Sequence, residues 1–371
     1  MKVLHLASFN GNIGDNAHHQ GFRSGFEAVF GKVDWFQKEI RRFYNSWGLE
    51  AFDQKFCDEV NQYDALVIGG GNFFEVCHDY SETGCTINLN KQTIEAIKIP
   101  VFFNALGFDI HKGANKENLA KFHSFMKEIC ERNDFLVTFR NDGSVENYES
   151  VYGKLDSNIY KIPDGGFFVE SNRSHAIEAQ KKTIGINLAS DMINLRLLQH
   201  TYDEFLNILA SVYIKLVKEQ GIVLRFFPHI LSDYKIISDL LDLFDDHLIK
   251  YSVEIMPYLT GQGREQEIFS SYAECEVVTG MRFHTNVCAF GMGIKTVPLV
   301  TYPKIKHIFT DIGHDDMLVD VNGIGFELSY FNKLNESVNA HFEIDNSETV
   351  SKLRADQLKI IGLFKTIFDK K

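Results

Sequence analysis

The chain has 371 residues, of which 44% are hydrophobic and 24% charged, an ordinary composition for a globular protein with room for two hydrophobic cores. Its formal net charge of -12 argues against nucleic acid as a partner, because phosphate backbones are bound by broad basic surfaces. It does not exclude a small anionic substrate, since a few cations gathered in one cleft can outweigh the total charge locally.

Short apolar runs alternate along the chain with longer amphipathic stretches, the pattern of βα units around a parallel sheet. In the first half, strands are expected at residues 3–7, 65–68, 101–107 and 135–139, with a helix from residue 17. In the second half, strands are expected at residues 183–188, 222–227, 276–279 and 296–300, with a helix at 202–219. The sequence therefore predicts an α/β fold of two domains, at residues 1–170 and 183–335, joined by a polar linker at 170–182.

The last segment, residues 350–371, predicts an amphipathic helix. Apolar residues recur there at helical spacing, and residues 352–371 carry six Lys or Arg with two Asp. We interpret it as a helix that packs its apolar face on the body of the protein. The alternative is a peripheral contact with the inner face of a membrane, because basic amphipathic helices bind anionic headgroups.

The opening segment, the apolar runs and the cysteines indicate the cellular compartment of the protein. The opening segment, residues 1–8, turns polar too early for a signal peptide, and no run approaches the ~20 apolar residues of a membrane span. Six scattered cysteines are typical of free thiols in a reducing compartment. Cys77, His78 and Cys85 lie close in sequence, but no second ligand pair follows at zinc spacing. We therefore expect a cytoplasmic protein and predict no metal site.

Glycine or polar side chains stand at the ends of the four strands expected in the first half. Asn12, Gly14 and Asp15 come after the first strand, Gly70, Gly71 and Asn72 after the second and Arg140 after the fourth, while the third carries Asn104 within its last residues. Ligands of doubly wound folds bind beyond the carboxyl ends of strands, where glycine lets backbone N–H groups approach an anion. Each glycine alone is as consistent with a tight turn, and His18 and His19 are interpreted as solvated or capping residues. The turns form no clean G-x-G-x-x-G or Walker A motif, so neither a nicotinamide cofactor nor a P-loop nucleotide is predicted.

The second half has a sharper signal, because Arg282 and His284 follow a strand and open a helix. Lys304 lies just beyond the next strand, so both turns should share one edge of the sheet. Arginine matches a carboxylate or phosphate, lysine is a point charge, and histidine exchanges a proton near neutral pH. Each residue alone has a structural alternative: helix-start pairing for Arg282, core hydrogen bonding for His284, and surface exposure for Lys304. Together with Arg140 they predict a cation cluster for a small, multiply anionic substrate.

The order and spacing of these motifs resemble those of the polysaccharide pyruvyl transferase family. The resemblance runs from about residue 1 to residue 315 and rests on these motifs: Asn12-Ile13-Gly14-Asp15, Gly69-Gly70-Gly71-Asn72, Asn104-Ala105-Leu106-Gly107, Arg140 with Ser144, Pro163-Asp164 with Phe167, and Arg282-Phe283-His284 with Lys304. It implies two Rossmann-like domains facing across a cleft, as in GT-B glycosyltransferases, with the acceptor on the N-terminal side. It also implies phosphoenolpyruvate as the donor substrate and no cofactor. The implied acceptor is a sugar of a cell-surface polysaccharide or of its lipid-linked precursor.

Residue by residue, the resemblance implies that Arg140 and Lys304 hold the donor and that His284 acts as the general acid. Asp15 is a candidate base or sugar-hydroxyl acceptor. The family usually has an acidic residue directly after the arginine, whereas this chain has Asn141 there and Asp142 one step later. Two other functions stay open: a nucleotide-sugar glycosyltransferase on the same fold, and a non-catalytic sugar-binding or assembly subunit.

Overall fold

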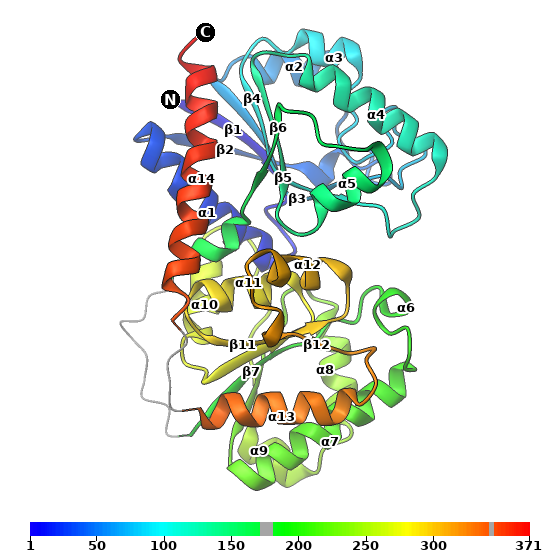
Figure 1. Cartoon of the computed structure of the whole chain (residues 1–371), viewed down its shortest axis with the longest axis vertical. Helices are drawn as coiled ribbons and strands as arrows, with labels where there is room; N and C mark the ends of the chain where they lie inside the picture. Colours follow the sequence, from blue (N-terminus) through cyan, green and yellow to red (C-terminus); the bar gives the residue numbers. More distant parts are fainter. Residues whose placement is uncertain (171–180, 341–344) are drawn as a thin grey trace. The chain divides into compact units, whose positions relative to one another are not determined.

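A computed structural model describes residues 1–170, 181–340 and 345–371 (Figure 1). The contacts divide the chain into two compact units, each built on a six-stranded parallel sheet. Unit 1 comprises Met1–Phe9, Phe22–Asp164 and Lys352–Lys371. Unit 2 comprises Asn10–Gly21 and Gly165–Ser351. Most of the linker predicted at 170–182 lies outside the described residues.

In unit 1 the strands follow the order β2-β1-β3-β4-β5-β6, and each paired neighbour is parallel. The strands are β1 (Lys2–Ala7), β2 (Asp34–Glu39), β3 (Ala65–Glu75), β4 (Val101–Asp109), β5 (Phe135–Arg140) and β6 (Ile159–Ile162). The helices are α1 (Ile13–Phe30, which begins in unit 2), η1 (Ile40–Phe43), α2 (Gln54–Val60), α3 (Lys91–Ala96), α4 (Lys116–Cys130), α5 (Ser144–Tyr152) and α14 (Ser347–Phe368). The four expected strands are confirmed. The sequence missed β2 and β6, two edge strands whose partly exposed residues interrupt the apolar pattern.

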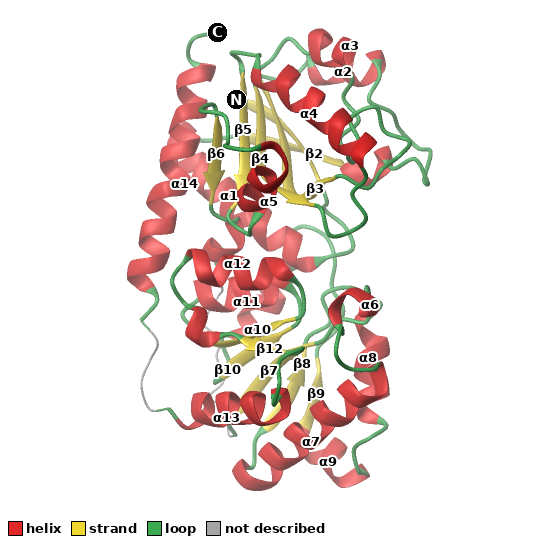
Figure 2. Cartoon of the chain, turned by 45° about the vertical axis from the view of Figure 1, so that its right-hand side comes forward, coloured by secondary structure: helices red, strands yellow, loops and turns green. Residues whose placement is uncertain are grey.

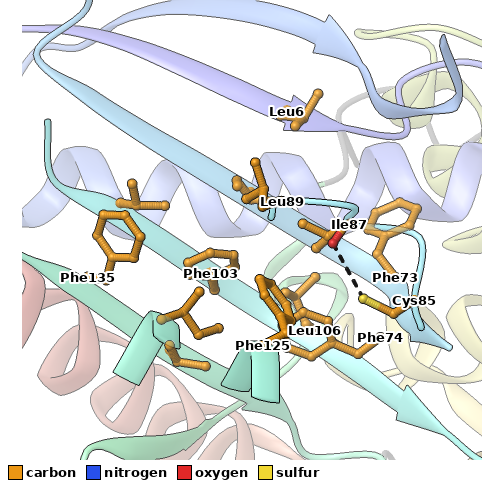
Figure 3. Packing of buried hydrophobic residues seen from close by; sticks show 14 of the residues in the cluster. Leu6, Phe73, Phe74, Cys85, Ile87, Leu89, Phe103, Leu106, Phe125 and Phe135 are labelled. Carbon is orange, nitrogen blue, oxygen red and sulfur yellow. Dashed lines mark hydrogen bonds between the residues drawn. The ribbon is translucent and has the colours of Figure 1, made fainter. Parts of the chain in front are cut away.

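The sheet of unit 1 is buried on both faces, as the periodicity of its central strands shows. In β4, Val101 and Phe103 belong to one hydrophobic core, and Phe102 between them belongs to the other. Successive side chains of a strand point to opposite faces, so a strand covered on both sides reads as a continuous apolar run. Figure 3 shows the larger core, where Phe103 and Phe125 lie together and the Cys85 thiol donates a hydrogen bond to the carbonyl oxygen of Ile87 at 3.7 Å.

The helix α14 covers the second core of unit 1. Ile360, Ile361 and Phe364 are buried, and the Phe364 ring lies 5.0 Å from the ring of Phe102 and 6.1 Å from that of Phe26. This confirms the interpretation that the helix packs its apolar face on the body of the protein, and that face is no longer available to a membrane surface. Across the described part of the chain, none of the helices combines the length and the apolar character that a bilayer span requires.

In unit 2 the strands follow the order β12-β11-β10-β7-β8-β9, again with parallel neighbours. The strands are β7 (Thr183–Asn187), β8 (Val223–Phe226), β9 (Val253–Ile255), β10 (Val277–Gly280), β11 (Lys295–Val300) and β12 (Val319–Asp320). The helices are η2 (Gly165–Phe168), α6 (Ile193–Arg196), α7 (Tyr202–Gln220), α8 (Asp233–Leu241), α9 (Asp246–Ser252), α10 (Glu265–Tyr272), α11 (Phe283–Gly291), α12 (Pro303–Asp311), η4 (Asp315–Met317) and α13 (Phe326–Asn339). Figure 2 distinguishes the strands and helices of both units by colour.

Residues 10–21, which fall inside the predicted range 1–170, group with unit 2. The reason is packing: Ile13 and Ala17 of α1 are fully buried in a core with Phe269, Cys288 and their neighbours. The backbone N–H of Ile13 also donates a hydrogen bond to the carbonyl oxygen of His229 at 3.3 Å. The first turn of α1 therefore belongs structurally with the second half of the chain.

Candidate functional site

The first turn of α11 and the first turn of α12 lie at the same edge of the unit 2 sheet, as predicted from the sequence. Their strands, β10 and β11, are hydrogen-bonded neighbours. The Thr301 hydroxyl donates to the carbonyl oxygen of Met281 at 3.2 Å, and Arg196 donates to both that carbonyl and the Thr301 hydroxyl. Half-buried Lys304 follows in the turn, with its Nζ 5.4 Å from the centre of the Phe283 ring. These contacts bring Lys304 beside the residue that precedes His284.

Gly14 lets the first turn of α1 lie directly against His284. A Cβ atom at Gly14 would stand 2.5 Å from the His284 Cβ and 2.8 Å from its Nδ1, closer than any real contact. The His284 Nδ1 lies 3.7 Å from the Asp15 Oδ1. Asn12 holds this carboxylate, because its side-chain oxygen accepts the Gly14 N–H at 3.0 Å while its amide donates to the Asp15 Oδ1 at 3.3 Å. The structure thus brings four predicted residues, Asn12, Gly14, Asp15 and His284, into one cluster within unit 2.

Arg282 caps α11 but is bound by two carboxylates of unit 2. Its Nε donates to the Asp233 Oδ2 at 2.8 Å and its Nη2 to the Asp191 Oδ1 at 2.7 Å. Burial works against the charge of this guanidinium, but hydrogen bonds and charge from Asp233 and Asp191 outweigh it and raise the pKa. Arg282 therefore stays charged, and its charge is balanced by the protein itself. This is the helix-start pairing that the sequence left open as the structural alternative.

Three further histidines lie in the same part of unit 2. His18 and His19 are 1% and 3% exposed, so the prediction that they are solvated is wrong. The Nδ1 of His18 accepts the N–H of Gly165 at 3.0 Å, and its ring centre lies 6.3 Å from that of His284. Fully buried His229 contacts the Tyr272 hydroxyl through Nε2 at 2.7 Å. Burial first, and then the nearby charges of Arg282 and His284, lower the pKa of His229 well below its ordinary value.

In unit 1, the turn predicted at Gly69–Asn72 is not a turn. β3 continues to Glu75, so Gly69–Asn72 lies inside the strand, and Asn104–Gly107 lies inside β4, as the expected strand at 101–107 has it. The pairing of β3 with β4 shifts register in this region, and Gly69 and Gly70 have φ of +124° and +88°. A Cβ atom at Gly69 would stand 2.4 Å from the carbonyl oxygen of Asn104. The glycines therefore serve a bulged pair of strands, where side-chain-free backbone permits the close approach.

A rare backbone conformation fixes the bulge in β4. Ala105 has φ of +47°, a region that non-glycine residues seldom adopt, and Asn104 before it is 1% exposed. The Thr138 hydroxyl accepts the Ala105 N–H at 2.8 Å and donates to the Phe103 carbonyl oxygen at 2.8 Å. Such strain persists only where the surroundings determine it fully, which marks this bulge as a candidate functional element of unit 1.

Asn72 and Arg140 meet beside Gly107 in unit 1. A Cβ atom at Gly107 would stand 2.1 Å from the Asn72 Oδ1 and 3.2 Å from the Arg140 Nη2. The Asn72 amide donates to the carboxylates of Glu75 and Asp109, each at 3.0 Å. The side chain of Asn72 is thus already fixed in orientation by two acidic partners.

Arg140, the last residue of β5, is 2% exposed and paired with two carboxylates. Its Nε donates to the Asp142 Oδ2 at 2.7 Å, and its Nη1 donates to the Asp164 Oδ2 at 3.4 Å. The Ser144 hydroxyl holds Asp142 from the other side at 2.5 Å. The acidic residue that stands one step later than usual in this chain therefore still reaches the arginine. Asn141, in the usual acidic position, accepts the N–H of Asp164 instead, at 3.0 Å.

One group of side chains in unit 1 has the ligand types of a metal site. Glu75, Cys77 and His78 each offer one ligand atom, and these atoms lie within 4.8 Å of one another. The Lys112 Nζ lies 2.6 Å from the Glu75 Oε1, so this carboxylate already has a cationic partner. Burial, helped by the charge of Glu75, raises the pKa of the Cys77 thiol. The carboxylate of this group therefore already has a partner within unit 1.

A family model described as polysaccharide pyruvyl transferase matches residues 9–302, which include the motifs described above except Lys304, two residues beyond the match. The chain belongs to the polysaccharide pyruvyl transferase family. A search of curated protein sequences gives no match.

Several solved structures resemble this family member over the whole chain. The UDP-GlcNAc 2-epimerase from Methanocaldococcus jannaschii aligns with a TM-score of 0.60 at 10% identity, covering 99% of this chain and 100% of that one. A putative UDP-N-acetylglucosamine 2-epimerase from Listeria monocytogenes aligns with a TM-score of 0.57 at 9% identity, covering 100% and 97%. The UDP-GlcNAc 2-epimerase from Neisseria meningitidis, bound to UDP-GlcNAc, aligns with a TM-score of 0.54 at 11% identity, covering 100% and 99%. At these identities the likeness shows the fold, two Rossmann-like α/β units of the GT-B type.

Sequence reasoning missed the partners that surround the predicted cations. Asp191 and Asp233, which bind Arg282, come from segments that follow β7 and β8, and neither segment carries a recognisable motif. Buried Arg196 and His229 come from the same two segments. One signal in the sequence could have identified two of these residues. Polar residues just after the end of a strand mark ligand sites in this fold, and His229 and Asp191 both stand in that position.

Proposed function

We propose that this pyruvyl transferase family member moves the enolpyruvyl unit of phosphoenolpyruvate onto a sugar. The acceptor is a residue of a cell-surface polysaccharide or of its lipid-linked precursor, and the products are a cyclic pyruvate ketal and phosphate. The observation that carries the proposal is the cluster of His284 and Asp15 in unit 2, held by Gly14 and Asn12, in a chain whose family is known. Lys304, at the same edge of the sheet, supplies the cation for the donor.

His284 is the proposed general acid. Its Nδ1 faces the Asp15 carboxylate, which orients the ring for proton transfer through Nε2. Transfer of that proton to the methylene carbon of phosphoenolpyruvate makes a methyl group and leaves the adjacent carbon electrophilic. A sugar hydroxyl forms a bond to this carbon, and its proton returns to the histidine.

The ketal closes in a second step. The bond between the same carbon and the phosphate oxygen breaks, and phosphate leaves with the bonding electron pair. A second sugar hydroxyl then forms a bond to that carbon, and its proton leaves with the phosphate or to water. Lys304 is proposed to hold the carboxylate or phosphate of the donor, where a fixed cation stabilises developing negative charge.

In this proposal, Arg140 and Arg282 position neighbouring groups and do not bind the donor directly. Each guanidinium is already bound by two carboxylates of its own unit. Arg282 fixes the start of α11 and hence the place of His284. Arg140 fixes Asp142 and Asp164 beside the bulged strands of unit 1. Asn72, Gly70, Gly71 and Asn104 of those strands are retained as proposed substrate-binding residues.

The test is calorimetric titration of phosphoenolpyruvate into the wild type, Lys304→Ala and Lys306→Ala. Lys306 is exposed two residues further along α12, so its removal changes the net charge equally without touching the proposed site. We expect saturable binding to the wild type and to Lys306→Ala, and a loss of about tenfold or more in Lys304→Ala. Equal affinity of the two lysine variants would contradict the role of Lys304.

A parallel titration with UDP and UDP-GlcNAc decides between donors on this fold. Binding of the nucleotides with no response to phosphoenolpyruvate would replace the proposal by a nucleotide-sugar glycosyltransferase. Sugar binding without turnover of either donor would favour the non-catalytic subunit.

A further inference from the structure

Unit 1 contains a second feature, a polar cavity of about 660 Å³ that the cluster around His284 does not use. Its walls come from residues 38–59, which begin at the carboxyl end of β2, and from Tyr80 and Asn88, which follow β3. Cavities of ~300–1,000 Å³ bury small ligands, and in parallel sheets such ligands lie beyond the carboxyl ends of the strands. The position and size of this cavity are therefore those of a ligand site on the unit 1 sheet.

The charges in the cavity wall cancel one another. Three basic side chains and three acidic ones line it: Lys38, Arg42, Lys55, Glu50, Asp53 and Glu59. The Lys38 Nζ lies 2.6 Å from the Glu50 Oε2 and 2.9 Å from the Glu59 Oε2, and the Arg42 Nε lies 2.5 Å from the Glu50 Oε1. Burial works against the charge on Lys38, but the hydrogen bonds that it donates to Glu50 and Glu59 outweigh burial and raise its pKa. With Lys38 and Arg42 already paired and the basic and acidic side chains of the wall equal in number, the cavity does not suit a multiply charged anion.

Aromatic side chains lie in the wall and on the loop beside it. Tyr44 and Tyr80 line the cavity, and Tyr80 is 45% exposed. Trp47 stands on the same loop with its ring 6.2 Å from that of Tyr44, and 51% of its surface is exposed. Leu49 of the wall is 56% exposed. An exposed apolar cluster rimmed by charged groups marks a binding surface on a soluble domain, because leaving it in water gains nothing for the fold.

Amides add hydrogen-bond capacity that is not charged. The Asn88 Oδ1 accepts the N–H of Glu82 at 2.8 Å and the hydroxyl of Ser81 at 3.2 Å, which orients the side chain. Its Nδ2 group then faces other partners as a donor, and Asn45 contributes a second amide to the wall. Flat aromatic faces beside paired charges and amides match a sugar ring, which has apolar C–H faces and hydroxyls that both donate and accept.

We propose that this cavity binds a neutral saccharide, with sugar rings on Tyr80 and Trp47 and hydroxyls on the paired charges of Lys38, Arg42 and Glu50. It is the acceptor site of the transferase, an assignment of role that rests on the function proposed above. Sugar binding by the cavity is independent of the donor and is tested without it.

The experiment is saturation-transfer difference NMR on the full chain. The probes are the methyl glycosides of glucose, galactose and mannose and of their 2-acetamido counterparts, with glucuronate as the charged comparison. The variants are Tyr80→Ala and Trp47→Ala, and the control is Tyr251→Ala, which removes a side chain that is 64% exposed on α9 of unit 2. Circular dichroism shows that each variant is folded.

We expect saturation transfer to at least one neutral glycoside from the wild type and the control, and affinity about tenfold weaker in both cavity variants. Absence of transfer to every neutral glycoside, transfer to glucuronate alone, or unchanged affinity in Tyr80→Ala and Trp47→Ala would overturn the proposal. The calorimetric titration of phosphoenolpyruvate separates the two proposals. Donor binding should be equal in wild type and Tyr80→Ala, and sugar binding without donor binding would leave the cavity standing while the transferase proposal fails.

Discussion

The two units hold their motif arginines in the same manner and differ in what lies next to them. Arg140 ends β5 of unit 1, Arg282 follows β10 of unit 2, and each is paired with two carboxylates. Beside Arg282 stands a histidine in contact with an acid at the start of α1, whereas beside Arg140 stand two bulged strands. An arginine that belongs to a sequence motif can therefore already be paired with carboxylates of the protein in the folded structure. The cluster proposed for proton transfer lies in unit 2, and unit 1 offers shaped backbone and hydrogen-bonding groups.

The largest effect should come from removing a carboxylate that pairs with Arg282 in unit 2. Asp233 is fully buried, pairs with Arg282, and accepts the N–H groups of His229 and Ile230. Asp233→Ala leaves a buried guanidinium short of one partner, which costs about 3–5 kcal/mol of unfolding free energy. Chemical denaturation measures the loss.

The control for that variant is an exposed ion pair of the same unit. Lys250 and Asp246 pair at 2.7 Å on α9 with both side chains mostly exposed. Lys250→Ala should change stability by no more than about 0.5 kcal/mol. If Asp233→Ala lost no more unfolding free energy than Lys250→Ala, the pairing of Arg282 would not stabilise unit 2. The comparison drawn between the two arginines would then be wrong.

Gly14→Ala should be the next largest effect, and it acts on turnover. The added methyl group would stand 2.5 Å from the His284 Cβ, so the histidine or the helix start must move. A displacement of this kind in a catalytic group costs about 100-fold in kcat, or about 2.7 kcal/mol. A pyruvyl transfer assay with phosphoenolpyruvate measures it, at concentrations that separate kcat from KM.

The matched control is Gly362→Ala, a helix glycine of α14 with nothing within 4 Å of the added atom. Its kcat should equal that of the wild type. A normal kcat in Gly14→Ala would show that His284 need not lie where it does, and the proton chemistry could no longer be assigned to unit 2 on this ground.

The same contrast explains which features the sequence could predict. The parallel sheets follow from apolar runs, because strands buried on both faces carry a signal in every residue, as Phe102 and Phe103 do. The cluster of Arg282, His284 and Lys304 at one sheet edge follows from the parallel connection of neighbouring strands. Local sequence patterns do not reveal residues that folding brings together from distant segments. The pairing of Asp233 with Arg282 therefore could not be predicted. The bulge at Gly69 was misread as a turn, because glycine at positive φ has the same sequence signature in both.

The smallest effect tests whether His229 belongs to the buried part of the unit 2 cluster. Burial and the charges of Arg282 and His284 hold its pKa well below 6.5 in the folded chain. Above pH 6.5 the residue is neutral in both states and has no effect on the pH dependence. As the pH falls below 6.5, the unfolded chain binds a proton at His229 and the folded chain does not, so stability is lost with acidification. Between pH 7.5 and pH 5.5 this residue should account for a loss of up to about 1.4 kcal/mol.

The measurement is the difference in unfolding free energy between the two pH values, for wild type, His229→Gln and His247→Gln. The glutamine at 229 lowers stability at both pH values by losing the contact with Tyr272, but that loss cancels in the difference. His247 is exposed on α9, so its variant should follow the wild type. If His229→Gln lost as much stability on acidification as the wild type, His229 would be able to accept a proton in the folded chain. Burial and the positive charges of Arg282 and His284 would then be too weak to keep His229 neutral in the folded chain.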